Sequence, residues 1–184
     1  MVVDTPVTGN MGTDNKSGLP DDVLEAVAGL HSLFKDNGLT LSVAESCTGG
    51  LISHYITQLP GASRFFMAGV ISYSALAKER ILNVPLEVIE TSGVVSEEAV
   101  REMAKGVMGL VGSGLALAIT GNLGPEALEG KENGLIYVGV CSKGSGQVRV
   151  KKLLLKGGRM ENKKEAALEA LRFLLEEARN QTGP

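Results

Sequence analysis

The chain has 184 residues and a mass of 19.2 kDa, a length that fits one domain. Apolar residues make up 43% of it and the mean hydropathy is +0.12, which excludes a largely disordered chain. The formal net charge of −3 leaves no basic surplus to neutralise phosphate backbones, so nucleic acid is not expected as a partner.

The N-terminal segment 1–19 is rich in Gly, Thr, Asp and Asn, and it contains neither a basic segment nor an apolar run. It is predicted to be a disordered tail without a secretion signal. No apolar run approaches the ~20 residues that span a membrane. The two cysteines and two histidines match no disulfide or metal-ligand spacing. We therefore expect a cytoplasmic protein without membrane contact or a metal site, folded as a single domain over residues 20–180.

Helix and strand patterns alternate along the rest of the chain. Helices are predicted over residues 20–38, 51–59, 76–82, 96–108 and 161–179. Strands are predicted over residues 39–44, 65–73, 115–120, 134–141 and 147–155, the second of them buried. The last two strands flank a Lys-Gly-Ser-Gly turn and form a hairpin. The order predicts an α/β fold: a three-layer α/β/α sandwich on a mixed, mostly parallel sheet with one antiparallel strand.

Polar segments follow three of the predicted strands, at residues 45–50, 72–78 and 120–125. Ligands of open α/β sheets bind beyond the carboxyl ends of strands, so these segments are the candidate site.

The first segment places hydroxyl groups and backbone N–H groups at a helix N-terminus, which stabilises a phosphate or a developing oxyanion. Ser46 is its candidate nucleophile, and an ordinary helix N-cap is the alternative. Cys47 is a rival nucleophile, because the pKa of a thiol falls at a helix N-terminus. A free cysteine is more often a small buried hydrophobe, so Cys47 ranks below Ser46.

The second segment begins at Tyr73, and Ser74 and Lys78 share one helix face at i and i+4. A lysine near a serine in a desolvated cleft has a lowered pKa and serves as a base. The alternative is a solvated helix lysine. No histidine lies near the polar strand ends, so a serine hydrolase here would use Lys or Tyr instead of a Ser-His-Asp triad.

The remaining candidates are weaker signals. Thr120 and Gly121 end a buried strand and offer a hydroxyl and a close backbone to a ligand, with a simple loop as the alternative. Arg159 precedes the last helix, where its guanidinium could bind a phosphate or carboxylate, with a surface turn as the alternative. The basic run from Arg149 to Lys156 fits a solvated strand face better than a polyanion site.

Four stretches together resemble one known family: AESCTGGLIS (44–53), LPGASRFFMAGVISYSALAK (59–78), GVVSEEAVREMAKG (93–106) and AITGNLGP (118–125). They are similar, in order and spacing over about residues 22–178, to the CinA carboxyl-terminal domain family. Its enzymes are nicotinamide-nucleotide amidohydrolases of pyridine-nucleotide salvage, and its larger members add an N-terminal molybdopterin-binding-like domain. The chain looks like the stand-alone form.

The resemblance implies an α/β/α sandwich that hydrolyses the carboxamide of nicotinamide mononucleotide to nicotinate mononucleotide and ammonia. Ser46 would attack the amide carbon, Lys78 would act as base, and Tyr73 would support the proton relay. Backbone N–H groups around Thr48–Gly50 would stabilise the oxyanion. The implied substrate-binding positions are Cys47, Thr48, Gly49, Gly50, Thr120, Gly121 and Arg159. The resemblance implies no organic cofactor. A homo-oligomer is also expected, with small-residue helix faces such as Met103–Gly114 available to a partner.

Three departures from the family pattern keep alternatives open. The loop 122–130 is bulkier and more acidic than the usual Ala-Gly-Pro and glycines, Lys163 and Lys164 stand where a second arginine is usual, and Ala75 replaces an asparagine. The loop would narrow the pocket or repel a phosphate. The alternatives are a catalytically silent nucleotide-binding or oligomerisation module, and an amidase for a different small amide.

Overall fold

The computed structural model describes residues 17–126 and 128–182 of the chain. Most of the predicted tail therefore lies outside the described residues. Leu19, at its end, is only 6% exposed and packs into the hydrophobic core. The predicted boundary between residues 19 and 20 is wrong for this reason, since the folded part begins before Pro20.

One five-stranded sheet forms the centre of the molecule, in the order β2-β1-β3-β4-β5. The strands are β1 (Leu41–Glu45), β2 (Phe66–Ile71), β3 (Leu115–Gly121), β4 (Leu135–Ser142) and β5 (Val148–Leu154). Strand β1 runs parallel to β2 and β3, whereas β4 runs antiparallel to both β3 and β5. The mixed, mostly parallel sheet with one antiparallel strand is confirmed.

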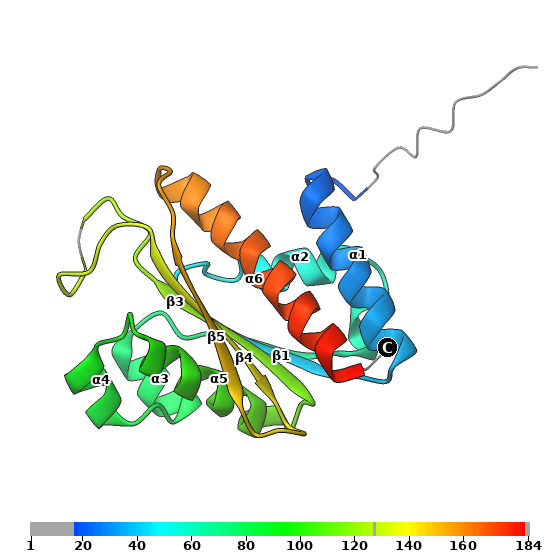
Figure 1. Ribbon diagram of the computed structural model, residues 1–184, viewed down its shortest axis with the longest axis horizontal. Helices are drawn as coiled ribbons and strands as arrows, with labels where there is room; N and C mark the ends of the chain where they lie inside the picture. Colours follow the sequence, from blue (N-terminus) through cyan, green and yellow to red (C-terminus); the bar gives the residue numbers. More distant parts are fainter. Residues whose placement is uncertain (1–16, 127, 183–184) are drawn as a thin grey trace, which may run out of the picture.

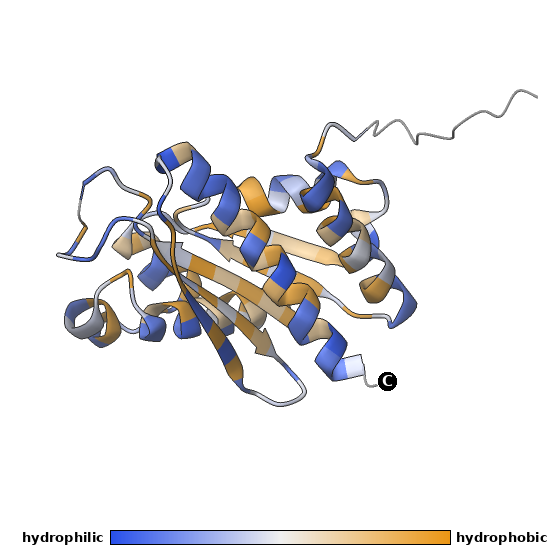
Figure 2. Ribbon diagram, turned by 45° about the horizontal axis from the view of Figure 1, so that its top comes forward, coloured by the Kyte–Doolittle hydropathy of each residue, from blue (hydrophilic) through white to orange (hydrophobic). Residues whose placement is uncertain are grey.

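Helices cover both faces of this sheet (Figure 1). One layer holds α1 (Asp21–Asp36), α2 (Leu51–Gln58) and α6 (Arg159–Thr182), and the other holds α3 (Ala75–Leu82), α4 (Leu86–Ser92) and α5 (Glu97–Val111). The helices of the first layer bury apolar residues in one core cluster with the sheet, and the ribbon of α6 carries both hydrophobic and hydrophilic residues along its length (Figure 2). The three-layer α/β/α sandwich is confirmed. No helix in the described part of the chain combines the length and the apolar character that crossing a membrane requires.

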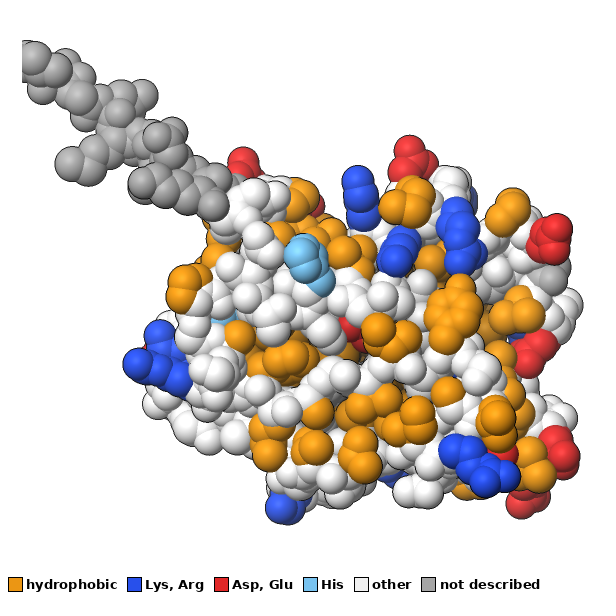
Figure 3. Space-filling view, turned by 180° about the vertical axis from the view of Figure 1, so that it is seen from behind, with side chains coloured by type: hydrophobic (Ala, Val, Ile, Leu, Met, Phe, Trp, Pro, Cys, Tyr) orange, Lys and Arg blue, Asp and Glu red, His pale blue; other side chains and the backbone are white. Residues whose placement is uncertain are grey.

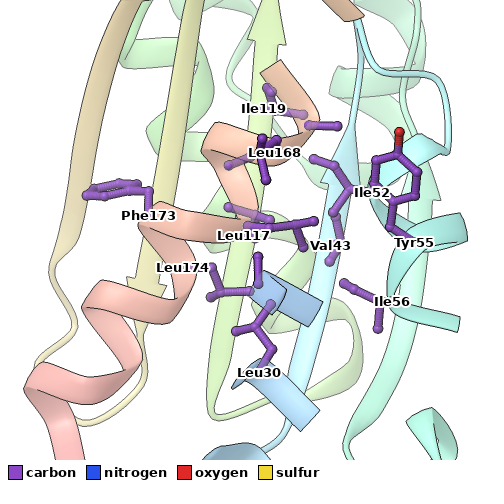
Figure 4. Packing of buried hydrophobic residues seen from close by; sticks show 14 of the residues in the cluster. Leu30, Val43, Ile52, Tyr55, Ile56, Leu117, Ile119, Leu168, Phe173 and Leu174 are labelled. Carbon is purple, nitrogen blue, oxygen red and sulfur yellow. The ribbon is translucent and has the colours of Figure 1, made fainter. Parts of the chain in front are cut away.

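Central strands β1 and β3 are buried on both faces, and the two faces differ in side-chain size. Large residues pack toward α1, α2 and α6 (Figure 4): Leu41, Val43, Leu117 and Ile119. Small residues face α5: Ser42, Ala44, Ala116 and Ala118. Helix α5 therefore lies close to the sheet, and a Cβ added at Gly139 of β4 would lie 3.2 Å from the carbonyl oxygen of Val100. Close packing of this kind fixes the strand ends that carry the site.

Two sequence predictions fail at the edge next to β1. The strand predicted over 65–73 is not buried: Met67 and Ile71 of β2 are 48% and 54% exposed, because β2 is an edge strand with one neighbour. Helix α4 was not predicted. It follows Pro85 and buries none of its residues, so it lacks the apolar periodicity that reveals a helix.

The expected partner surface on Met103–Gly114 is largely used inside the domain. Met103, Ala104 and Val107 pack on the sheet, and Gly106 abuts the carbonyl of Leu82. Apolar side chains do gather on the face opposite to that of Figure 1, as Figure 3 shows. The homo-oligomer stays a prediction.

Two residues of the basic run of β5, Arg149 and Lys151, face α6. Lys151 Nζ lies 2.8 Å from a carboxylate oxygen of Glu169, and Arg149 Nε lies 3.9 Å from one of Glu177. These pairs favour the solvated, ion-paired strand face over a polyanion site.

Candidate active site

The three predicted polar segments meet at the carboxyl edge of β1, β2 and β3. The N–H of Ser46, after β1, donates to the carbonyl oxygen of Ile119 in β3 at 3.1 Å. The N–H of Ser72, after β2, donates to the carbonyl oxygen of Glu45 at 2.8 Å. These bonds continue the parallel ladders one residue beyond the strands, and they fix both turns relative to each other.

A buried serine–lysine pair lies at the centre of this edge. Nζ of Lys78, on the first turn of α3, lies 3.0 Å from Oγ of Ser46 and donates at 2.8 Å to the carbonyl oxygen of Ser72. Lys78 is fully buried and Ser46 is 7% exposed. Burial lowers the pKa of Lys78 from 10.5 to about 8, and the thiol of Cys47 and the carboxylate of Glu129 oppose this effect. About a tenth of this amine is neutral at pH 7, and about half at pH 8, and the neutral form is able to accept the proton of the serine hydroxyl.

Helix α2, which follows Ser46, is capped by a carboxylate from the preceding strand. Glu45 is fully buried, and its two carboxylate oxygens accept hydrogen bonds from the N–H groups of Gly50, Ile52 and Ser53 and from the Ser53 hydroxyl, at 2.7–3.1 Å. An anion at a helix N-terminus is stabilised by the helix dipole and by these donors. Glu45 thereby anchors the turn that presents Ser46.

Because Glu45 caps α2, not all of the N–H groups of Thr48–Gly50 can serve as the expected donors to an oxyanion. The N–H of Gly50 is engaged by Glu45, and the N–H of Gly49 donates to the carbonyl oxygen of Ser46 at 3.1 Å. Neither group is available to a ligand in this arrangement. Within residues 17–126 and 128–182, the N–H groups of Cys47 and Thr48 donate to no backbone carbonyl or carboxylate oxygen, although both act on the thiol of Cys47, and they lie nearest in sequence to Ser46. The hydroxyl of Thr48 is also buried without a hydrogen-bond partner among these residues.

Cys47 does not have the depressed pKa that a thiolate nucleophile needs. Burial raises the pKa of its thiol to about 12, and the nearby N–H groups and Lys78 offset this only partly. The sulfur lines the cavity beside Ser46 and packs in the hydrophobic core. The structure thus favours Ser46 over Cys47 as nucleophile.

Arg159 joins three segments around the mouth of the site. Its guanidinium donates at 2.7 Å to the carbonyl oxygen of Gly124 and at 3.0 Å to the hydroxyl of Tyr73. Tyr73 is 61% exposed, and its hydroxyl forms no hydrogen bond with Ser46 or Lys78. The hydroxyl of Tyr73 thus lies at the rim of the cavity, next to the arginine, and its part in a proton relay stays a prediction.

Thr120 holds a neighbouring segment instead of pointing freely at a ligand. Its hydroxyl donates to the carbonyl oxygen of Val94 at 2.7 Å, which leaves the oxygen able to accept one further bond. Ser74 also differs from expectation. Its hydroxyl accepts from the N–H of Ala77 as the N-cap of α3, while Lys78 turns inward to Ser46.

These groups surround a partly open cavity of about 100 Å³. Every predicted catalytic residue except Lys78 lines it, and Lys78 reaches it through Ser46. The lining residues are Ser46, Cys47, Tyr73, Val94, Val95, Thr120, Gly121, Asn122, Leu123, Leu128 and Arg159. The described residues contain no cluster of three His, Cys, Asp or Glu side chains that could hold a metal ion.

Sequence reasoning missed the roles of Glu45, Ser72 and Glu129. For Glu45 a signal was present, since an acidic residue ending an apolar strand immediately before a helix is placed to cap it. The contact of Ser72 with Lys78 runs through its backbone carbonyl, which no side-chain pattern reveals.

Comparisons with known proteins find relatives in sequence and in structure. The family model described as the CinA C-terminal domain matches residues 24–178. A putative competence-damage inducible protein from Moorella thermoacetica is 41% identical over 165 residues, which cover 89% of this chain and 39% of that protein. One from Bacillus subtilis is 40% identical over 127 residues, covering 69% of this chain and 30% of the relative. The chain thus spans less than half the length of these curated relatives.

Solved structures match over nearly their whole length. The competence/damage inducible protein CihA from Agrobacterium tumefaciens has a TM-score of 0.83 and 31% identity, with 88% of this chain and 98% of that one covered. A CinA superfamily protein from Escherichia coli has a TM-score of 0.82 and 30% identity, covering 86% of this chain and 93% of the other.

Proposed function

The chain belongs to the CinA C-terminal domain family, and on that premise we propose that it hydrolyses the carboxamide of a nicotinamide nucleotide. Nicotinamide mononucleotide is the proposed substrate, with nicotinate mononucleotide and ammonia as products. The observation that carries the proposal is the buried pair of Ser46 and Lys78, 3.0 Å apart, in which burial lowers the pKa of the lysine to about 8. No metal or organic cofactor enters the proposed reaction.

In the first half-reaction Lys78 accepts the hydroxyl proton of Ser46 while Oγ attacks the carboxamide carbon. The carbonyl oxygen becomes an oxyanion, and the N–H groups of Cys47 and Thr48 are the nearest donors to stabilise it. When the C–N bond breaks, the ammonium group of Lys78 returns its proton to the leaving nitrogen, which departs as ammonia. An ester of Ser46 with the ring carboxyl group remains.

The second half-reaction uses the same groups in reverse. Lys78, neutral again, accepts a proton from a water molecule, and the resulting hydroxide attacks the ester carbon. The ester C–O bond breaks, and Oγ of Ser46 recovers the proton from Lys78. The product forms as the carboxylic acid, which loses its remaining proton to solvent and leaves as nicotinate. Fully buried Lys78 is held by the Ser72 carbonyl in both steps, so its amine stays aimed at Ser46.

Recognition of the nucleotide is proposed to lie at the rim. A cavity of about 100 Å³ is smaller than the roughly 300–1,000 Å³ of sites that enclose a whole ligand, so only the ring carboxamide would be enclosed. Ribose and phosphate would then lie outside, toward Tyr73 and Arg159. Two guanidinium N–H groups of Arg159 are used within the protein, which leaves three donors for a phosphate.

The size of the cavity also favours a second candidate, an amidase for a small amide without phosphate. The two candidates differ at Arg159. A nucleotide needs its positive charge, whereas a small neutral amide does not.

The test is ammonia release from nicotinamide mononucleotide by the wild type, Ser46→Ala and Lys78→Ala. Lys105→Ala is the matched control, because Lys105 lies half-exposed in a surface pair with Glu102. Loss of activity in the two site variants alone, with unchanged circular dichroism, supports the proposal. An unchanged rate in Ser46→Ala rejects Ser46 as nucleophile, and a wild type that releases no ammonia rejects this substrate.

A further inference from the structure

The loop between β3 and β4 reaches across the cavity to the segment that precedes α5. The carboxylate of Glu129 accepts hydrogen bonds from the N–H groups of Val94 and Val95, at 3.1 and 3.4 Å. In the described parts of the chain these are the only hydrogen bonds between residues 123–131 and residues 93–96. One exposed side chain therefore ties two walls of the cavity together.

The segment that receives Glu129 is shaped for it. Gly93 has a φ of +84°, which favours glycine, and a Cβ there would overlap a carboxylate oxygen of Glu129. The hydroxyl of Ser96 donates to the carbonyl oxygen of Gly93 at 2.9 Å, and Thr120 holds the carbonyl of Val94. The carbonyl groups of Gly93 and Val94 thus accept hydrogen bonds from side chains at the start of α5 and in β3. The N–H groups of Val94 and Val95 donate to Glu129.

The tie bears directly on the cavity. Val94 and Val95, which donate to Glu129, line one wall of the cavity. Leu128, the neighbour of Glu129, lines the cavity from the loop. Leu128 is 46% exposed, so its position over the cavity depends on what holds its backbone. The charge of Glu129 also reaches the reacting groups, because it counteracts the effect of burial on the pKa of Lys78.

We propose that Glu129 sets the substrate specificity of this cavity. By holding Leu128 against the Val94–Val95 segment, it limits the enclosed space to one flat ring that carries an uncharged carboxamide. Its negative charge disfavours the carboxylate form of the same ring, which promotes release of the product. A cavity of about 150 Å³ holds benzene in another protein, so one of about 100 Å³ encloses at most a single ring. The inference rests on the proposed function for the identity of the ring and the reaction.

The first test asks whether the hydrogen bonds of Glu129 to Val94 and Val95 keep the cavity closed, and it requires no enzyme assay. Cys47 lines the cavity and is 7% exposed, so its alkylation by iodoacetamide, followed by peptide mass spectrometry, reports how closed the cavity is. The reaction is run at about pH 9, because burial raises the pKa of this thiol and only the thiolate reacts. Glu129→Ala is expected to speed alkylation of Cys47 about tenfold. The matched control Glu126→Ala removes an exposed carboxylate from the same loop and leaves the rate unchanged. Cys141, buried against Met108, is the internal control for folding.

The second test measures specificity in the Ser46→Ala background, where substrate is not consumed. Protection of Cys47 from alkylation is titrated with nicotinamide mononucleotide and with nicotinate mononucleotide. The tied protein is expected to prefer the amide, and Glu129→Gln to reduce the amide-to-acid preference about fivefold, since it keeps the length but loses the charge.

Each outcome decides the inference. An unchanged alkylation rate in Glu129→Ala overturns the tie, even if the wild type is an active amidase. An unchanged preference when Glu129→Gln is added to Ser46→Ala, or a Ser46→Ala protein that neither nucleotide protects, overturns the specificity. Faster alkylation and altered preference in an enzyme without amidase activity would support the inference and reject only the proposed reaction.

Discussion

Replacing Lys78 by methionine is expected to abolish activity and, at pH 7, to make the protein more stable. Methionine fills nearly the same volume with an apolar side chain, and the ammonium group that it removes is fully buried. Burial lowers the pKa of Lys78 from 10.5 to about 8, a difference of about 2.5, which corresponds to about 3 kcal/mol that the folded state loses by holding a charged lysine. The hydrogen bonds to Ser46 and Ser72 offset part of this, so we expect a net gain of about 1–3 kcal/mol.

The sign of the pH dependence follows from the same two values. Between pH 8 and 10.5 the folded protein binds fewer protons at Lys78 than the unfolded chain does, so the stability of the wild type rises with pH over this window. Below pH 8 both states carry the charge and the full penalty is present. The advantage of Lys78→Met should therefore be constant at and below pH 7 and shrink by about 2 kcal/mol by pH 10.

The assay is urea unfolding of wild type and Lys78→Met at pH 7 and pH 10, followed by circular dichroism and compared at equal m-values. Lys105→Met is the matched control, since it removes an exposed lysine and should change stability by less than about 0.5 kcal/mol at either pH. A Lys78→Met protein that is less stable than the wild type at pH 7, or an advantage that does not depend on pH, would refute the proposed desolvation of the amine.

Three further predictions follow from the site. Because only neutral Lys78 can accept the serine proton, kcat/KM should rise about tenfold per pH unit below pH 7 and level off above about pH 8; a flat profile from pH 6 to 9 would contradict the assigned base. Arg159→Ala should raise the KM for nicotinamide mononucleotide about tenfold and hardly change that for the nucleoside without phosphate, with Arg159→Lys intermediate; equal changes for both ligands would argue against phosphate binding there. Glu45→Gln should lower the free energy of unfolding by about 2–3 kcal/mol and reduce kcat, because the cap of α2 loses a charge and an acceptor; urea unfolding that matches the wild type would disprove the role of the cap.

The parts of the fold that follow from local patterns were predicted from the sequence. The apolar spacing of α1, α5 and α6 and the buried runs of β1 and β3 gave their positions to within a few residues. Helix α4 was missed because it buries no residue, and β2 was wrongly predicted as buried because a strand's place in the sheet depends on non-local pairing. Leu19 was assigned to the tail because a single apolar residue has no periodicity.

In the candidate site, the residue types were predicted but their contacts were not. Ser46 and Lys78 are 32 residues apart, and only the pairing of β1 with β2 brings their turns together. The bond of Arg159 to the Tyr73 hydroxyl spans 86 residues, a separation that no local pattern reveals. The acidic loop was read as an obstacle to the ligand, yet Glu129 uses its charge on two backbone N–H groups.

The single reversed strand, β4, has a consequence for how such a domain can evolve. Because β4 runs against β3, the connection between them begins and ends at the edge where Ser46 lies, and it need not cross the sheet as a helical crossover must. Insertions and substitutions in residues 122–133 can therefore change which molecules are accepted, while the reacting pair on the turns after β1 and β2 and the layers beneath remain untouched. The reacting residues and the residues that select the substrate thus lie in separate segments of the chain, so substitutions can accumulate in one without altering the other.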